Sequence, residues 1–351
     1  MAVAPDGNSR TAAREEQNIV QDWYIYQGHG EPHQGIQRLP EPPPWRNVAQ
    51  GRSADRAMER SAMRARSYQS DPHTVQAVNA ALLLRRPLLV TGRPGTGKSS
   101  LAHHVAHELG LGRVLSWPIT SRTSLKDGLY TYDAIGRLRE AGRLAAARPQ
   151  PRPEDPPLVD EGSDIGTYLR LGPLGTALLP SPHPRVLLVD ELDKSDIDLP
   201  NDLLHVFEGG DFEIPELMRL ARERTVEVLT DDPGGVAAVV HGRVQCSEFP
   251  FVVITSNGER EFPPAFLRRC VSLELVEPDD EKLARIVEAH LGVDATGRAR
   301  ELIGTFLRNR DEGLVSTDQL LNAIYLSLGD GSAADREELV RLLLRPLGPG
   351  T

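Results

Sequence analysis

The residues best suited to chemistry lie in the segment GRPGTGKS, from Gly92 to Ser99, which fits the pattern GxxxxGK(S/T). An apolar run, Leu88 to Thr91, precedes this segment and a helical pattern follows it, which is the order that a phosphate-binding loop needs. Its glycines let backbone N–H groups turn inward around an anionic phosphate, and the N-terminus of the following helix adds a partial positive charge. An incidental glycine-rich turn is the alternative, and the strand, loop and helix in register argue against it.

Within this loop, we expect Lys98 to bridge the β- and γ-phosphates of a nucleotide and the Ser99 hydroxyl to bind Mg²⁺. The residues expected to contact the nucleotide are Gly92, Arg93, Pro94, Gly95, Thr96, Gly97, Lys98, Ser99 and Ser100. The segment therefore predicts a site for a nucleoside triphosphate and its magnesium ion.

Two carboxylates, Asp190 and Glu191, end a second apolar run, Val186 to Val189. Open parallel sheets bind ligands at the carboxyl ends of their strands, so we expect both carboxylates beside the phosphate-binding loop. Asp190 suits a position on or next to Mg²⁺, and Glu191 suits polarisation of an attacking water. A plain acidic turn at a strand end is the alternative.

A third apolar run, Phe251 to Thr255, is followed by Asn257, a neutral amide that can contact a γ-phosphate or position water without adding negative charge. An Asn-Gly turn explains the same residues in any fold. Farther on, Arg268 and Arg269 could reach the nucleotide of a neighbouring subunit as an arginine finger. Surface arginines stabilised by a helix dipole are the alternative, and the spacing leaves both open.

Between the break at Asp71-Pro72 and Pro278, short apolar runs alternate with helical patterns, which predicts an α/β fold with a buried parallel sheet. The expected strands are Leu88 to Thr91, Val114 to Trp117, Val186 to Val189, Phe251 to Thr255 and Val271 to Leu275. After Pro278 only helical patterns remain, at 280–291, 298–309, 317–328 and 335–345. We therefore expect a separate small all-α domain at the C-terminal end.

The expected domains are an irregular aromatic and proline-rich arm at 1–52, an α/β domain at 53–277 and a helical domain at 278–347. In the arm, Trp23, Tyr24, Tyr26 and Trp45 are expected to dock on the α/β domain. A proline-rich surface loop at 148–162 interrupts an insert at about 120–182, because proline fixes φ and removes a backbone donor.

Composition excludes several classes of protein for this chain of 351 residues. The formal net charge of −10 argues against a protein that coats duplex nucleic acid. The two cysteines, Cys246 and Cys270, have no spacing typical of zinc sites or disulfide frameworks, which fits a reducing cytosol. No signal-peptide core is visible, and no apolar run reaches the roughly 18 residues of a membrane-spanning helix. We expect a cytoplasmic protein.

The phosphate-binding loop, the strand ending in Asp190 and Glu191, the TSN strand and the segment PPAFLRRC occur in that order, and helices follow. Together they resemble an AAA+ ATPase over roughly residues 66–330, and they are most similar to the MoxR-like branch and its relatives in bacterial conflict systems. The resemblance implies a three-layer αβα sandwich of the P-loop type, followed by a small helical lid.

The same resemblance implies roles for single residues. It makes Asp190 and Glu191 the Walker B pair, Asn257 sensor 1, and Arg269, rather than Arg268, the finger that acts on a neighbouring subunit. It also implies ATP and Mg²⁺ as cofactors, a homo-oligomeric ring taken as a hexamer, and an insert after the second strand that faces the ring axis or a client.

One departure from the family pattern concerns the lid. MoxR-like lids present an arginine in an SPRA-type motif, whereas the corresponding stretch here is Ser316-Thr317-Asp318-Gln319. Three functions are therefore weighed. The first is an ATPase that remodels a protein partner in a bacterial defence or stress system. The others are a nucleic-acid-stimulated motor and a nucleotide-gated assembly scaffold with little turnover.

Two further signals have less weight. Phe212 could enter a hairpin that lines a pore, but a place in the core is at least as consistent with its apolar surroundings. His103 and His107 have a spacing that could bind a metal, but no third ligand accompanies them, so packing against the sheet is favoured.

Overall fold

A computed structural model of the chain describes residues 25, 33–40, 42–43, 61–62, 64–65, 67–147, 165–220, 225–292, 296–312, 315–328 and 333–344. The predictions for Trp23, Tyr24, Tyr26, Trp45 and the loop 148–162 lie outside these residues. The chain divides into two compact units, one of residues 50–289 and the other of residues 1–49 with 290–351.

The larger unit is built on a five-stranded sheet in the order β11-β1-β10-β5-β2, in which all neighbouring strands are parallel. Its strands are β1 (Leu88–Thr91), β2 (Leu115–Pro118), β5 (Val186–Asp190), β10 (Phe251–Ser256) and β11 (Val271–Glu274). The predicted parallel sheet is confirmed, and its strand ends differ from those expected by at most one residue. Every residue of β10 is buried, as a central strand covered on both faces requires.

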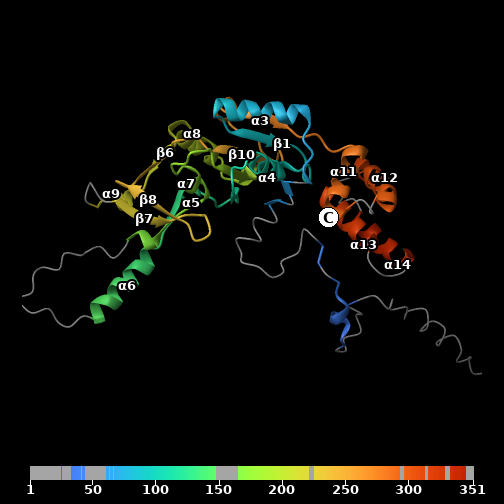
Figure 1. The fold of residues 1–351 in the computed structure, drawn as a ribbon, viewed down its shortest axis with the longest axis horizontal. Helices are drawn as coiled ribbons and strands as arrows, with labels where there is room; N and C mark the ends of the chain where they lie inside the picture. The colour runs from blue at the N-terminus through green and yellow to red at the C-terminus, as the bar shows by residue number, and fades with distance from the viewer. Residues whose placement is uncertain are drawn as a thin grey trace, which may run out of the picture. The chain divides into compact units, whose positions relative to one another are not determined.

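Side chains of alternate residues in this sheet enter two separate cores. On one face, Leu88, Val90 and Val253 pack against α3 (Pro72–Leu84) and α4 (Lys98–Glu108). On the other face, Leu89 and Ile254 join a core that includes side chains of α7 (Pro173–Ala177), α8 (Leu199–Gly209) and α10 (Pro264–Leu267). Helices therefore cover both faces, which is the three-layer αβα arrangement expected, and Figure 1 shows α3 lying along the sheet.

A second sheet of six strands, in the order β3-β4-β7-β8-β9-β6, was not expected from the sequence. Its strands are β3 (Tyr130–Tyr132), β4 (Leu169–Leu171), β6 (Asp211–Glu213), β7 (Thr225–Leu229), β8 (Val236–Val240) and β9 (Arg243–Gln245). Only β4 and β7 pair in parallel. Buried side chains such as Leu169, Val226 and Val244 join the core that also covers the parallel sheet.

The predicted insert supplies part of this second sheet. It contains α5 (Leu125–Leu129), β3, α6 (Ala134–Ala147), the 3-10 helix η3 (Ile165–Tyr168), β4 and α7. Phe212 lies in β6, is 7% exposed and stacks on the ring of Tyr130 at a centroid separation of 6.5 Å. In the structure Phe212 is therefore a core residue.

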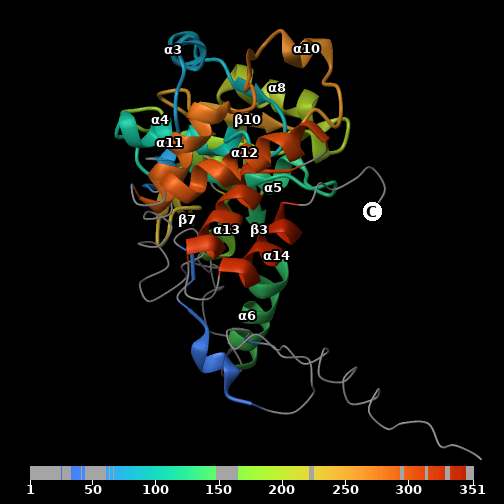
Figure 2. The same ribbon diagram turned by 90° about the vertical axis from the view of Figure 1, so that its right-hand side faces the viewer.

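The described residues after Pro278 contain four helices: α11 (Asp280–Leu291), α12 (Thr296–Glu312), α13 (Thr317–Leu328) and α14 (Ala333–Leu343). Each begins and ends within three residues of the helix predicted from the sequence. Figure 2 shows α12, α13 and α14, whose buried side chains include Phe306, Ile324 and Val340. The division between the units falls within α11, so the predicted domain boundary at residue 278 stays a prediction.

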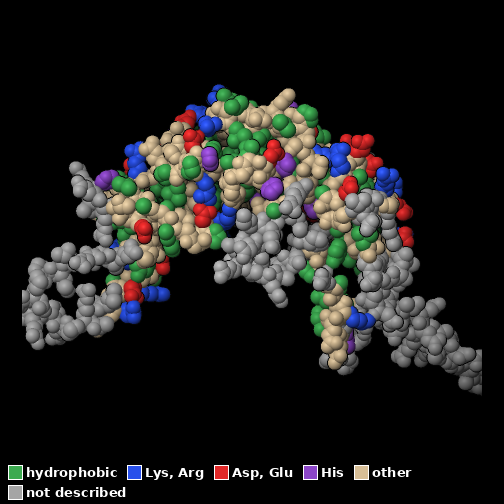
Figure 3. Space-filling model, in the orientation of Figure 1, with side chains coloured by type: hydrophobic (Ala, Val, Ile, Leu, Met, Phe, Trp, Pro, Cys, Tyr) green, Lys and Arg blue, Asp and Glu red, His purple; other side chains and the backbone are tan. Residues whose placement is uncertain are grey.

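The remaining short elements are the 3-10 helices η1 (Gly35–Arg38) and η4 (Leu192–Lys194) and the helix α9 (Pro215–Met218). In the part of the chain that the structure describes, no helix is both long and apolar enough to cross a membrane. The cytoplasmic location stays a prediction. On the face of the described residues drawn in Figure 3, basic and acidic side chains are interspersed.

Candidate nucleotide-binding site

The predicted phosphate-binding loop connects β1 to α4, and its glycines adopt backbone conformations that other residues rarely take. Gly92, Gly95 and Gly97 have φ values of 144°, 82° and 89°. A Cβ atom on Gly92 would lie 2.6 Å from the carbonyl oxygen of Leu275, so no larger residue fits there without movement of the backbone. Gly97 is the N-cap of α4, which places the amide end of this helix at the loop.

Lys98, the first residue of α4, is only 7% exposed, and its ammonium group lies against the loop. It donates to the carbonyl oxygens of Gly92 at 2.7 Å and Arg93 at 2.9 Å. Burial lowers the pKa of Lys98, and the negative charges of Asp193, Asp190 and Glu191 oppose that shift. A buried ammonium group beside glycine amides is well suited to bind phosphate oxygens.

Asp190 at the end of β5 joins the loop to the neighbouring strand β10. Its Oδ1 accepts hydrogen bonds from the Ser99 hydroxyl and from the Thr255 hydroxyl, each at 2.7 Å. Ser99 belongs to α4 and Thr255 to β10, so residues distant in the sequence meet at the carboxyl ends of adjacent strands. Hydroxyl and carboxylate oxygens are ligands that Mg²⁺ prefers, so this donor set fits the predicted ion.

Glu191 directly follows β5, and its backbone is left-handed, with φ 61° and ψ 50°. Its N–H donates to the Thr255 hydroxyl at 2.8 Å. The carboxylate accepts from Asn257 Nδ2 at 3.3 Å and from Lys194 Nζ at 2.7 Å. The structure thus brings the predicted water-polarising carboxylate and the predicted sensor amide into contact.

The remaining loop residues lie at the surface or partly buried. The Arg93 guanidinium pairs with Glu277 at 3.1 Å, and the Thr96 hydroxyl donates to the Arg93 carbonyl at 2.9 Å. Pro94 and Gly95 are exposed, and Ser100 is half-buried. All of them lie in the connection from β1 to the first turn of α4, where a bound phosphate would lie.

Arg268 and Arg269 lie apart from this cluster within the chain. Both are exposed at the end of α10, and Arg269 pairs through Nε with Glu208 of α8. Arg269 Nη1 also donates to the Ala265 carbonyl at 3.2 Å. Both partners of Arg269 thus lie outside the cluster around Asp190.

The stretch Ser316 to Gln319 forms the cap of α13. The Ser316 N–H donates to Gln319 Oε1 at 2.7 Å, and the Gln319 N–H donates to the Ser316 hydroxyl at 3.4 Å. This reciprocal pair is a capping box, and Gln319 accounts for one half of it. The residues in place of the family's arginine motif thus have a local structural role.

Sequence reasoning missed three side chains at the site: Thr255, Asp193 and Lys194. Each lies within three residues of one that was predicted, but nothing in its type or spacing marks it for chemistry. In the sequence Thr255 marks only the end of an apolar run, whereas in the structure its hydroxyl contacts both Asp190 and the Glu191 backbone.

Comparison with known families identifies the domain to which these residues belong. A profile of the AAA domain family, dynein-related subfamily, matches residues 87–270, just over half of the chain. The chain belongs to the AAA domain family. The match spans the loop, Asp190, Glu191, Asn257 and both arginines of this AAA domain.

The chain was also compared with solved structures and with curated proteins. The structure of C. elegans PCH-2 is 12% identical, with a TM-score of 0.37, and the match covers 79% of this chain and 68% of that one. No curated protein matches the AAA-domain chain.

Proposed function

We propose that this AAA-domain protein hydrolyses ATP at a Mg²⁺-dependent site formed by the loop after β1 and the ends of β5 and β10. One observation carries the proposal: the Ser99 hydroxyl and the Asp190 carboxylate meet at 2.7 Å beside a buried Lys98. Next to them, Glu191 and Asn257 are in contact at the neighbouring strand ends. The groups needed to bind phosphate, bind the ion and activate water thus lie together at the carboxyl ends of β1, β5 and β10.

The mechanism rests on positioning and charge neutralisation. The loop amides, the α4 N-terminus and Lys98 would hold the phosphates. Ser99 and Asp190 would hold Mg²⁺, which would supply positive charge to neutralise the phosphates. Glu191 orients and polarises the attacking water. Asn257 contacts the Glu191 carboxylate and holds its direction without adding negative charge.

We further propose that copies of the chain form a ring, taken as a hexamer, in which Arg269 of one copy completes the site of the next. This is supported by the exposure of Arg269 and by its pairing with a surface residue, Glu208. The Arg269 side chain can leave this exposed ion pair and reach a neighbouring copy without disrupting the core. Arg268, equally exposed, is the alternative finger.

For the client, we propose a protein partner in a bacterial defence or stress system, on the MoxR-like resemblance. The interspersed charges of the face in Figure 3 and the net charge of −10 favour a protein over nucleic acid. A nucleotide-gated scaffold with little turnover is the second candidate, because both Glu191 oxygens already accept hydrogen bonds. A nucleic-acid-stimulated motor is the third.

The test is the steady-state ATPase rate measured against the concentration of the full chain. If sites are shared between copies, the rate per subunit rises with concentration. We expect Glu191→Gln to slow turnover by roughly 10²-fold or more while ATP still binds. Lys98→Ala should lose ATP binding. Arg269→Ala should be slowed on the order of 10³-fold, as for other arginine fingers.

Arg143→Ala is the matched control, because Arg143 is also an exposed arginine paired with a glutamate, Glu140. It should hydrolyse ATP at the wild-type rate. Equal activity of wild type and Glu191→Gln would refute the proposed site, and equal activity of Arg269→Ala would refute the finger. ATP-dependent assembly with negligible turnover would favour the scaffold, and stimulation by single-stranded DNA or RNA would favour the motor.

A further inference from the structure

Asp193 is a buried carboxylate that the mechanism above does not use. It lies in η4, two residues after Glu191, and is only 3% exposed. Its Oδ2 accepts hydrogen bonds from two backbone N–H groups, those of Asn257 at 2.8 Å and Glu259 at 3.1 Å. Burying a carboxylate is costly unless the charge is compensated, so its presence in this loop needs an explanation.

The backbone N–H groups that it binds lie just beyond the end of β10. The register of β10 with β5 ends at Ile254, and its register with β1 ends at Ser256. The N–H of Asn257 therefore has no strand partner, and Asp193 supplies the acceptor that the sheet does not. The turn that carries the sensor amide is thus fastened to the turn that carries Glu191.

This connection determines where the Asn257 side chain lies. With its backbone N–H held by Asp193, Asn257 directs Nδ2 to Glu191 Oε1 at 3.3 Å. Asn257 is followed by Gly258 at φ 80°, and glycine leaves the backbone of this turn more freedom than other residues would. The hydrogen bond from Asp193 restrains the turn at Asn257. Oδ1 of Asp193 is buried and has no hydrogen-bond partner among the described residues.

The charge of Asp193 also reaches the phosphate-binding loop. Burial lowers the pKa of Lys98, and the negative charge of Asp193 opposes this shift more strongly than that of Asp190 or Glu191.

We propose that Asp193 is a positioning residue for hydrolysis: through the two backbone amides it holds Asn257, and through Asn257 it holds Glu191 in the orientation that activates water. The inference rests on the proposed ATPase function and adds a residue to that same site. Asp193 itself contacts neither nucleotide nor water in this scheme.

The test is a double-mutant cycle of kcat in the full chain. We expect Asp193→Ala to lower kcat roughly tenfold with little change in KM, because misplaced catalytic groups slow chemistry more than they weaken binding. In the Asn257→Ala background, the same substitution should change kcat by less than about twofold. Asp193→Asn should remain near wild type, because its amide oxygen can still accept both N–H groups.

Amide hydrogen exchange at Asn257 and Glu259 supplies a measurement that does not depend on activity. Both amides should exchange faster in Asp193→Ala than in the wild type. Their exchange rates should not change in Asp196→Ala, because Asp196 is an exposed aspartate on the same loop. If Asp193→Ala does not fold, Asp193→Leu removes the acceptors while nearly keeping the size of the side chain.

Three results would each overturn the inference. The first is full additivity of the effects of the two substitutions on kcat, and the second is a loss of ATP binding as large as the loss of kcat. The third is an Asp193→Asn variant as slow as Asp193→Ala. Unchanged exchange of the two amides would overturn it as well. A wild-type chain that does not hydrolyse ATP would instead refute the proposed function, so the two failures are distinguishable.

Discussion

At the scale of single residues, Glu191 illustrates how the site uses an unfavourable conformation. A left-handed backbone in a residue other than glycine costs on the order of 1–3 kcal/mol and persists only when its surroundings hold it. Here the Thr255 hydroxyl binds the Glu191 N–H, and Asn257 and Lys194 bind the carboxylate. The turn after β5 is therefore held by groups from outside the strand that carries it.

His103 gives a prediction at the same scale. It lies on the buried face of α4, and its Nδ1 is 2.8 Å from the Ser61 hydroxyl. Burial, with the positive charge of Arg64, lowers the pKa of His103 to about 4, although Asp190 opposes the shift. Between this value and the unfolded value near 6.5, the unfolded chain binds more protons than the folded one.

The free energy of unfolding should therefore fall as pH falls through this window, by on the order of 3 kcal/mol in total. Urea unfolding at several pH values measures it. His103→Gln should flatten the dependence, whereas His107→Gln, at an exposed position of the same helix, should keep it. A His103→Gln variant with the wild-type slope would show that this histidine is not the group responsible.

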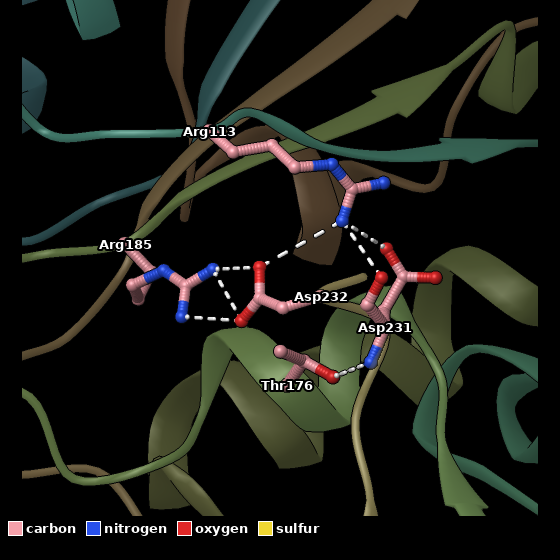
Figure 4. Close-up of polar contacts among 5 residues, drawn as sticks. All are labelled: Arg113, Thr176, Arg185, Asp231 and Asp232. Atoms are coloured by element: carbon pink, nitrogen blue, oxygen red, sulfur yellow. Dashed lines mark hydrogen bonds and ion pairs between the residues drawn. The ribbon is translucent and has the colours of Figure 1, made fainter. Parts of the chain in front are cut away.

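At the scale of elements, an ion-pair cluster fastens the second sheet to the parallel sheet (Figure 4). Asp231 and Asp232 lie between β7 and β8. Arg185 directly precedes β5, and Arg113 lies two residues before β2. Arg185 contacts both oxygens of Asp232 at 2.9 to 3.1 Å, and Arg113 contacts Asp231 at 3.1 Å. The Asp231 N–H also donates to the Thr176 hydroxyl at 2.9 Å.

Removal of this connection should destabilise the larger unit. Arg185 is partly buried, so its two-pronged contact is stronger than an open surface pair. We expect Arg185→Ala to lower the free energy of unfolding by about 1–3 kcal/mol and to lower Tm by several degrees. Calorimetry measures both. Arg143→Ala, which breaks an exposed pair on α6, should leave Tm unchanged, and an equal shift in the two variants would contradict the argument.

At the scale of the whole molecule, a shared site predicts complementation between two inactive variants. Glu191→Gln subunits still carry Arg269, and Arg269→Ala subunits still carry Glu191. In a mixed ring, an Arg269→Ala subunit beside a Glu191→Gln subunit has a complete site between them, because ring interfaces join different surfaces of each copy. An equal mixture should therefore recover up to roughly a quarter of the wild-type ATPase rate, as random neighbours allow.

Either variant alone at the same total concentration is the control for this mixture. Activity of the mixture that equals the mean of the two separate variants would show that each site is complete within one chain. Such a result would exclude a role for Arg269 in the site of a neighbouring copy, without affecting the roles proposed for Lys98, Asp190 or Glu191.

The parts of the fold that the sequence predicts well are those governed by local pattern. Runs such as Phe251 to Thr255 are apolar at every position because both faces of the parallel sheet are covered, and glycines at 92, 95 and 97 are required by the loop's own backbone. The strands of the parallel sheet, the phosphate-binding loop and the C-terminal helices could therefore be located from composition and spacing alone.

Tertiary structure decided what depends on partners distant in the chain. Strands of three residues such as β6 and β9 are too short to show a period, and they exist because they pair with each other and pack on the shared core. Asp193 looks like any acidic residue in a turn until β10 brings the Asn257 N–H within 2.8 Å of it. Local residue types determined the nucleotide loop and its carboxylates, whereas long-range packing determined which neighbours orient them.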